Sequence, residues 1–151
     1  MKKRYALAAF LMVLPAMTAF SADKHPAFKL RHHNFEVMGK AMKGIFDQFK
    51  KPSANLAIIN TNAAILAQSA KKVSGHFPKG TGPGNGVKTE ALPAIWEKPA
   101  EFKTATDRLV NTTTALQAAA TSGDMAKIQA AAGAVGGSCK GCHDSFRKPK
   151  G

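Results

Sequence analysis

The chain has 151 residues, which is enough for one domain with its own hydrophobic core. It contains 22 lysines and arginines against 9 acidic residues, for a formal charge of +13. The basic residues are scattered, and no aromatic interleaving or known nucleic-acid motif accompanies them, so we exclude nucleic acid as a partner. The charge either covers a solvated surface or steers the chain toward an acidic protein or an anionic lipid.

Residues 1–21 have the layout of a secretory signal peptide. A positively charged start at residues 2–4 leads into an apolar run over residues 6–20, and small residues lie at the positions that signal peptidase reads. We therefore predict export to the periplasm, cleavage before Ala22, and a single mature domain over residues 22–151. The apolar run is short for a membrane span, which makes an uncleaved N-terminal anchor the weaker alternative.

Four later stretches carry apolar residues at alternating spacings of three and four, the pattern of amphipathic helices. In chain order these seams are Phe35, Met38, Met42, Ile45 and Phe49; Leu56, Ile59, Ala63, Leu66, Ala70 and Val73; Phe102, Ala105, Leu109, Thr112, Leu116 and Ala119; and Ile128, Ala131 or Ala132, Val135, Cys139, Cys142 and Phe146. Pro52 separates the first two helices, and Ser53 is the predicted N-cap of the second. Gly123 and Asp124 start the last helix.

Between the second and third seams, residues 77–93 lose the helical period and are rich in glycine and proline, which predicts a loop. Loops of this length are uncommon in compact domains and often have a function. No stretch alternates with period two, so we expect no sheet. The predicted fold is all-α, an antiparallel four-helix bundle with a long loop between helices 2 and 3.

The chemistry is carried by Cys139-Lys140-Gly141-Cys142-His143, since C-x-x-C-H is the attachment signature of c-type haem. Residues three apart on a helix share a face, so Cys139 and Cys142 can each bond one vinyl group of a haem lying against that face. The ring of His143 can then reach the iron from the same side. We predict one covalent haem c with His143 as its axial iron ligand.

Other uses of the two cysteines fit less well. A disulfide between residues three apart would close too small a loop to stabilise the fold. A redox dithiol lacks its usual βαβ context, and a zinc site lacks a fourth ligand nearby. No acid–base pair accompanies His143, so we also expect the chain not to be an enzyme.

The motif's place on the last helix of a four-helix pattern resembles the class II cytochromes c, the cytochrome c′ family. Matches in the right order extend this resemblance over essentially the whole mature chain: Arg31, Phe35, Met38 and Gly39; Phe77, Pro78, Gly80 and Thr81; Glu90, Pro93, Ile95 and Trp96; Phe102, Gly123 and Asp124; and Gly136, Gly137, Ser138, Cys139, Lys140, Cys142, His143, Phe146 and Arg147. The resemblance implies a haem inside the bundle with one edge exposed.

The resemblance also implies roles for residues around that haem. Arg31 corresponds to a family arginine near the haem propionates, and His32 to the next position, which can touch the haem edge. Glu90 falls where the family often has an acidic residue near the haem. Arg147 matches an arginine one turn beyond the axial histidine, and its charge also suits the last turn of a helix.

The residue over the open face of the iron separates two kinds of family member. In cytochromes c′ an apolar side chain of the first helix covers that face and leaves the iron five-coordinate, whereas low-spin members place a ligating methionine there. Phe35 occupies this position, and a phenyl ring cannot ligate iron, so the resemblance implies a five-coordinate iron under Phe35. In the alternative, Met38, Met42 or His33 is the sixth ligand.

These two coordination states predict different functions. A five-coordinate iron implies binding of nitric oxide and carbon monoxide, and a six-coordinate iron implies a simple electron carrier. Electron transfer with a redox partner protein is expected in either case. The resemblance further allows a homodimer formed through the first two helices.

Overall fold

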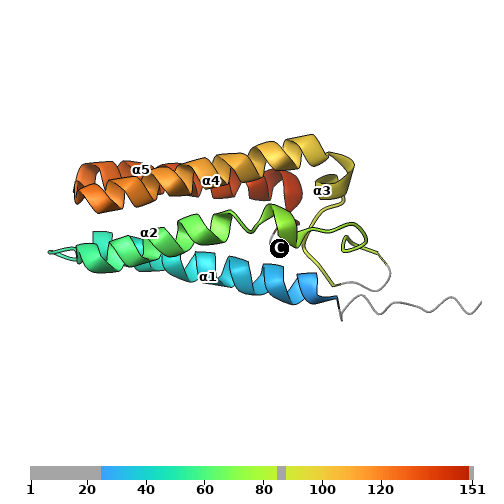
Figure 1. Ribbon diagram of the computed structural model, residues 1–151, viewed down its shortest axis with the longest axis horizontal. Helices are drawn as coiled ribbons and strands as arrows, with labels where there is room; N and C mark the ends of the chain where they lie inside the picture. The colour runs from blue at the N-terminus through green and yellow to red at the C-terminus, as the bar shows by residue number, and fades with distance from the viewer. Residues whose placement is uncertain (1–24, 85–87, 150–151) are drawn as a thin grey trace, which may run out of the picture.

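The computed structural model describes residues 25–84 and 88–149 (Figure 1). Its four long helices are α1 (Pro26–Phe49), α2 (Leu56–Ala70), α4 (Pro99–Ser122) and α5 (Met125–Phe146). They form an antiparallel bundle, so the predicted fold is confirmed. The predicted signal peptide lies outside the described residues, and no helix within them is long and apolar enough to cross a membrane.

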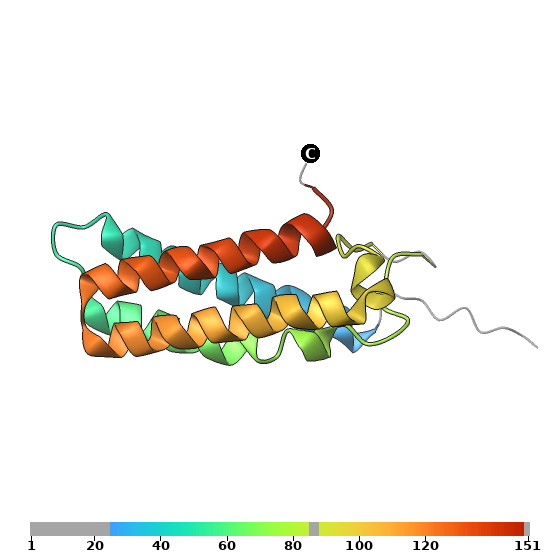
Figure 2. The ribbon, with the colours of Figure 1, turned by 90° about the horizontal axis from the view of Figure 1, so that it is seen from above.

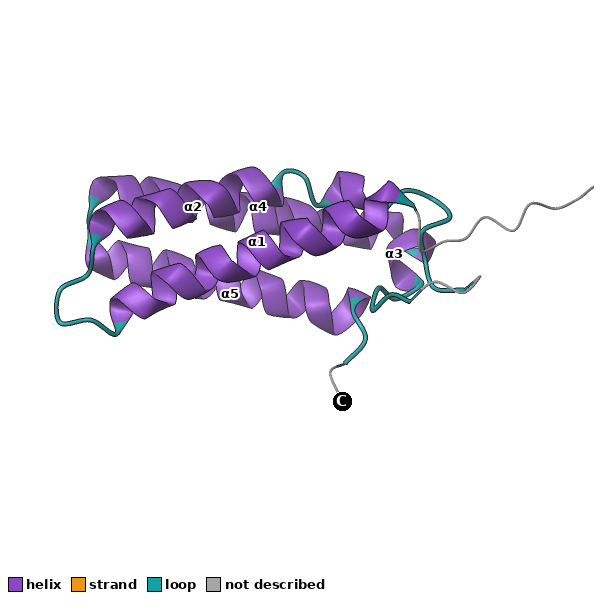
Figure 3. Cartoon of the chain, turned by 90° about the horizontal axis from the view of Figure 1, so that it is seen from below, coloured by secondary structure: helices purple, strands orange, loops and turns teal. Residues whose placement is uncertain are grey.

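The bundle consists of two hairpins, α1 with α2 and α4 with α5, which Figures 1 and 2 show running along a common axis. The hairpins meet mainly where α2 packs on α4, whereas α1 and α5 make few contacts with each other. Figure 3 views the bundle from the side of α1. Since α1 and α5 carry most of the predicted haem-contacting residues, the bundle packs least where the haem is predicted.

The predicted seams supply most of the hydrophobic core, but Phe35 and Leu56 are exposed, and on α4 Thr113 and Ala120 are buried in place of Thr112 and Ala119. Its fully buried large side chains include Ile45 of α1, Ile59 and Leu66 of α2, Leu116 of α4, and Ile128 and Val135 of α5. A second, smaller cluster of Ile95, Phe102 and Phe146 lies at the end of the bundle where the long connection returns to α4. The motif cysteines pack on these clusters, Cys139 on the first and Cys142 on the second.

The starts of α2 and α5 show how side chains fix helix ends. The prediction of Ser53 as the N-cap of α2 is wrong: Asn55 caps it, because its Oδ1 accepts from the amide of Ile58 at 3.2 Å. The side chain of Gln48 accepts from the amide of Asn55, which holds the cap in place. Asp124 caps α5 as expected, after Gly123 ends α4 with a left-handed φ of 71°.

The connection from α2 to α4 has more structure than its sequence predicted. It contains a 3₁₀ turn, η2 (Ser74–His76), and a short helix, α3 (Ala94–Glu97). Pro99 begins α4, and its ring prevents α3 and α4 from merging into one helix. The indole nitrogen of Trp96 donates to the carbonyls of Phe77 and Pro78 at 3.1 and 3.0 Å, which ties α3 to the start of the loop.

We expect Leu116→Ala to lower the free energy of unfolding by about 2–5 kcal/mol, because it leaves a cavity in the core. Leu116 is 0% exposed. The matched control is Leu30→Ala on α1, where the side chain is 55% exposed and we expect a loss below about 0.5 kcal/mol. Urea unfolding followed by circular dichroism measures both. Equal losses would contradict the central position of α4.

Candidate haem site

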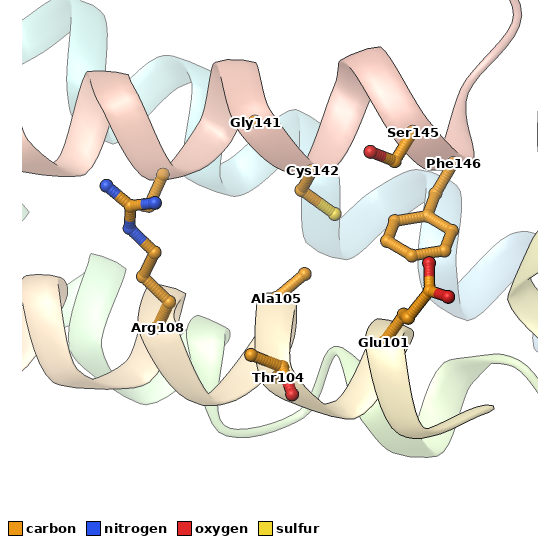
Figure 4. A pocket seen from close by; sticks show the side chains of 9 residues that line it. Glu101, Thr104, Ala105, Arg108, Gly141, Cys142, Ser145 and Phe146 are labelled. Atoms are coloured by element: carbon orange, nitrogen blue, oxygen red, sulfur yellow. The ribbon is translucent and has the colours of Figure 1, made fainter. Parts of the chain in front are cut away.

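The C-x-x-C-H motif lies on the penultimate turns of α5. Cys139 and Cys142 are half-buried and their thiols are free, whereas the side chain of His143 is exposed. In Figure 4 the sulfur of Cys142 points from α5 toward α4, near Ala105 and Phe146. The two thiols therefore face apolar side chains, and His143 lies on the solvent side of the same turn.

Burial keeps both thiols neutral at physiological pH. It raises the pKa of Cys139, and it raises the pKa of Cys142 to about 11, with a smaller contribution from the neighbouring Cys139. A thiol in such surroundings is a poor metal thiolate or redox nucleophile, because both need the charged form. Thioether bonds to haem carry no charge and suit the same surroundings.

Two hollows flank the motif. One of about 230 Å³ opens between α4 and α5, where Cys142, Ala105 and Phe146 contribute to its walls (Figure 4). The other, of about 520 Å³, lies on the side of His143 and Arg147. Both faces of the turn that carries the motif are thus accessible.

Arg31 is the most unusual polar residue of the site, because its guanidinium is buried with only 6% of the residue exposed. It lies over the ring of Phe28 at 4.2 Å and that of Phe77 at 4.9 Å. Its Nη2 donates to the carbonyl of Thr81 at 2.7 Å, while Nη1 is buried with no hydrogen-bond partner among the described residues. Burial lowers the pKa of Arg31.

An orphaned charged donor of this kind costs stability until an acceptor reaches it. A carboxylate is the natural partner of a guanidinium, and haem carries two of them. Together with two inward-facing thiols and an adjacent histidine, Arg31 gives the residues of this chain a good fit to haem c.

Phe35 follows Arg31 by one helical turn and remains 38% exposed. Its ring centroid lies 6.3 Å from that of Phe77. Phe77 in turn contacts Phe102 at 5.1 Å, and Phe102 contacts Phe146 at 5.3 Å. This row of rings connects the predicted distal residue on α1 with the cluster that packs on Cys142.

Phe77 belongs to a motif shared with the family, but the sequence alone predicts no role for it. The structure places it at the centre of the site, in contact with both Arg31 and Phe35. The sequence likewise predicts no role for Thr81, which is buried and whose carbonyl accepts a hydrogen bond from Arg31. The signal for both was the order Phe-Pro-x-Gly-Thr at the start of the loop.

Glu90 and Arg147 form an ion pair across 57 residues of sequence. Nε of Arg147 donates to Oε2 of Glu90 at 2.7 Å, and Nη2 contacts the same oxygen. The backbone joins the same segments, because the amide of Lys148 donates to Glu90 and that of Leu92 to Phe146. The long loop is therefore fastened to the end of α5, one turn beyond His143.

The remaining predicted residues lie apart from this group. His32 and His33 are both exposed on α1. Met38 is buried in the main core, and its sulfur accepts from Nδ2 of Asn34 at 3.8 Å. Met42 is half-buried against the same core. Both methionines are thus engaged in packing between helices.

Comparison with known proteins identifies the family. The family model for Cytochrome C′ matches residues 26–147, which include all four long helices and the motif. The chain belongs to the cytochrome c′ family. As a member of it, the chain carries haem c, for which it has the two attachment cysteines.

Individual cytochromes c′ align over different lengths. The protein of Rhodopseudomonas palustris is 34% identical over 151 residues, covering 99% of both chains. That of Rubrivivax gelatinosus is 44% identical over 87 residues, which cover 58% of this chain and 66% of the relative.

Solved structures of cytochromes c′ share the fold. The crystal structure from Rubrivivax gelatinosus has a TM-score of 0.74 and 35% identity, covering 81% of this chain and 94% of that one. The nitric oxide complex of a mutant of the Alcaligenes xylosoxidans protein has a TM-score of 0.74 and 31% identity, covering 87% and 98%. A carbon monoxide-bound variant of that protein has a TM-score of 0.72 and 32% identity, covering 82% and 94%.

In the haem-free chain at pH 8, we expect iodoacetamide to alkylate folded Cys142 roughly 100-fold more slowly than the urea-unfolded chain, because the thiolate is the nucleophile. The pKa of this thiol is about 11 when folded. For the same reason, the folded form should lose stability relative to the unfolded form as pH rises from about 8.5 toward 11. Mass spectrometry of timed reactions measures the rates. Equal rates in both states would show that the thiol is open to solvent.

Proposed function

We propose that the chain is a periplasmic, five-coordinate cytochrome c′ that binds small neutral gases such as nitric oxide and carbon monoxide. The observation that carries this proposal is Phe35, a half-exposed ring on α1 at the position where low-spin relatives have a ligating methionine. The gas-bound structures of related cytochromes c′ support it. The periplasmic location rests on the pattern of residues 1–21.

When bound, haem supplies a redox-active iron with exchangeable axial positions. Cys139 and Cys142 would hold it permanently, and His143 would be its protein ligand. The free Nη1 of Arg31 would bind a propionate and so fix the orientation of the ring. Phe35 would keep the opposite face apolar, which admits small neutral molecules and excludes charged ones.

Packing argues against the two methionines as sixth ligands. The sulfur of Met38 is buried in the main core beside Asn34, and Asn34 itself donates to the carbonyl of Ser69 at 3.0 Å. To bring this sulfur to an iron on the open side of α1, the helix would have to rotate, which would break the contact of Asn34 with Ser69 and remove Met38 from the core. Met42 lies one turn further on, against the same core.

An electron-carrier role is the second candidate, supported by the charge of +13, which suits an acidic redox partner. We do not assign an enzymatic activity.

A homodimer is consistent with the exposed apolar side chains of Phe46, Leu56 and Ile58, which belong to the end of the hairpin where α1 joins α2. Sedimentation equilibrium of the holoprotein tests this association.

After expression in a host that attaches c-type haem, we expect a covalently bound haem with a broad five-coordinate ferrous spectrum that shifts on addition of nitric oxide. The Cys139→Ser, Cys142→Ser double variant should lose its haem to acid–acetone extraction, because no thioether bonds remain. A sharp low-spin spectrum indifferent to nitric oxide would contradict gas binding. Met38→Leu and Met42→Leu would then show which sulfur ligates.

Replacing Phe35 by Met should convert the iron to a six-coordinate, low-spin state, since a thioether then lies where the ring covered the open face. The matched control is Phe46→Met on the same helix, where the ring is 41% exposed and packs on Phe49 instead. Absorption spectra of both ferrous forms measure the change, and carbon monoxide titration measures the accompanying loss of affinity. A high-spin spectrum in both variants would place Phe35 away from the iron.

A further inference from the structure

His76 has no role in the proposed function, yet its environment is unusual. It ends the 3₁₀ turn η2, directly before Phe77, and this turn packs against α1. Its Nδ1 is buried and has no hydrogen-bond partner among the described residues. Among the described residues, the other buried side-chain nitrogen without a partner is Nη1 of Arg31.

These two orphaned nitrogens lie on neighbouring elements. The guanidinium of Arg31 stacks over the ring of Phe77, the residue next to His76, with 4.9 Å from its carbon to the ring centroid. Its Nη2 is already engaged by the carbonyl of Thr81, in the loop that follows His76. Nη1 is the buried nitrogen of Arg31 that is left to bind a further group.

The two charged groups that shift the pKa of His76 are both cations. Burial lowers this pKa, and the charges of Lys72, two residues beyond the end of α2, and of Arg31, on α1, lower it further. No carboxylate among the described residues counteracts them in this shift. Two buried nitrogens that can donate, beside two cations, make a site for an anion, and the part of the chain that the structure describes supplies none there.

We propose that His76 donates from Nδ1 to the haem propionate that binds Nη1 of Arg31, so that the two side chains form one carboxylate site from two elements. This inference rests on the proposed function, which brings a propionate to Arg31. Arg31 supplies a permanent charge, whereas His76 supplies a donor that can titrate. His76 is thus a second propionate-binding residue.

The propionate would couple the proton of His76 to the charge of the iron. Ferric iron carries one positive charge more than ferrous iron and disfavours protonated His76, so reduction raises the pKa of the imidazole. In a reduction by a mediator dye, which supplies the electron, His76 would take up a proton from water within its titration range. The reduction potential should therefore fall as pH rises through that range.

The direct test is a nuclear Overhauser measurement on the wild-type ferrous carbon monoxide adduct, which is diamagnetic. We expect cross-peaks between the ring protons of His76 and the methylene protons of one propionate. A haem-loaded, carbon monoxide-bound protein without these cross-peaks would overturn the role of His76 alone. A chain without covalent haem would overturn both the proposed function and the role of His76. A haem-loaded chain that does not bind carbon monoxide would overturn only the gas-binding function.

The second test is the reduction potential of the holoprotein between about pH 5 and 9, measured by spectroelectrochemistry. His76→Gln keeps an N–H donor but cannot titrate, so we expect it to retain haem and lose most of the pH-dependent fall. His25→Asn at the N-cap of α1 is the matched control, because asparagine keeps the cap acceptor for the amide of Ala27, and it should keep the wild-type profile. An unchanged profile in His76→Gln would overturn the proposal.

Discussion

The packing of α2 on α4 is the contact on which the arrangement of this bundle depends. It joins two hairpins that otherwise meet little, and it leaves α1 and α5 only sparsely packed on each other. Ile59, Ala63, Leu66 and Ala70 of the α2 seam are buried, and the two alanines allow a close approach of neighbouring helices. One side of the bundle can therefore accept a large cofactor without disrupting the core that stabilises the other side.

The site depends on a row of aromatic rings at the end of this bundle. Phe77 contacts Phe35 and Arg31 of α1, and through Phe102 it connects to Phe146 of α5. The long loop thus supplies the packing that α1 and α5 do not give each other. A segment without helical period is therefore held in place around Phe77 and Trp96 by ring contacts and hydrogen bonds.

The sequence predicted those features of the molecule that depend on a periodic pattern or on a local motif. The four seams predicted the bundle because the buried face of an amphipathic helix repeats along the sequence. The motif on α5 predicted the cofactor because the spacing of its two cysteines and its histidine is what covalent haem attachment requires. The missed features depend on contacts distant in sequence. Asn55 and not Ser53 caps α2, because the side chain of Gln48 accepts a hydrogen bond from the backbone amide of Asn55. The buried, unpartnered nitrogen of His76 is visible only in the folded chain, where η2 packs against α1.

The fastening of residues 90–92 to residues 146–148 restrains the turn that carries the haem motif. Both segments lie beyond α2, outside the first hairpin, and the ion pair of Glu90 with Arg147 adds to their backbone hydrogen bonds. His143 lies one turn before Arg147, so the loop restrains the position of its turn from outside the main hydrophobic core. A change in the loop, distant from the motif in sequence, would therefore act on the haem site through the end of α5.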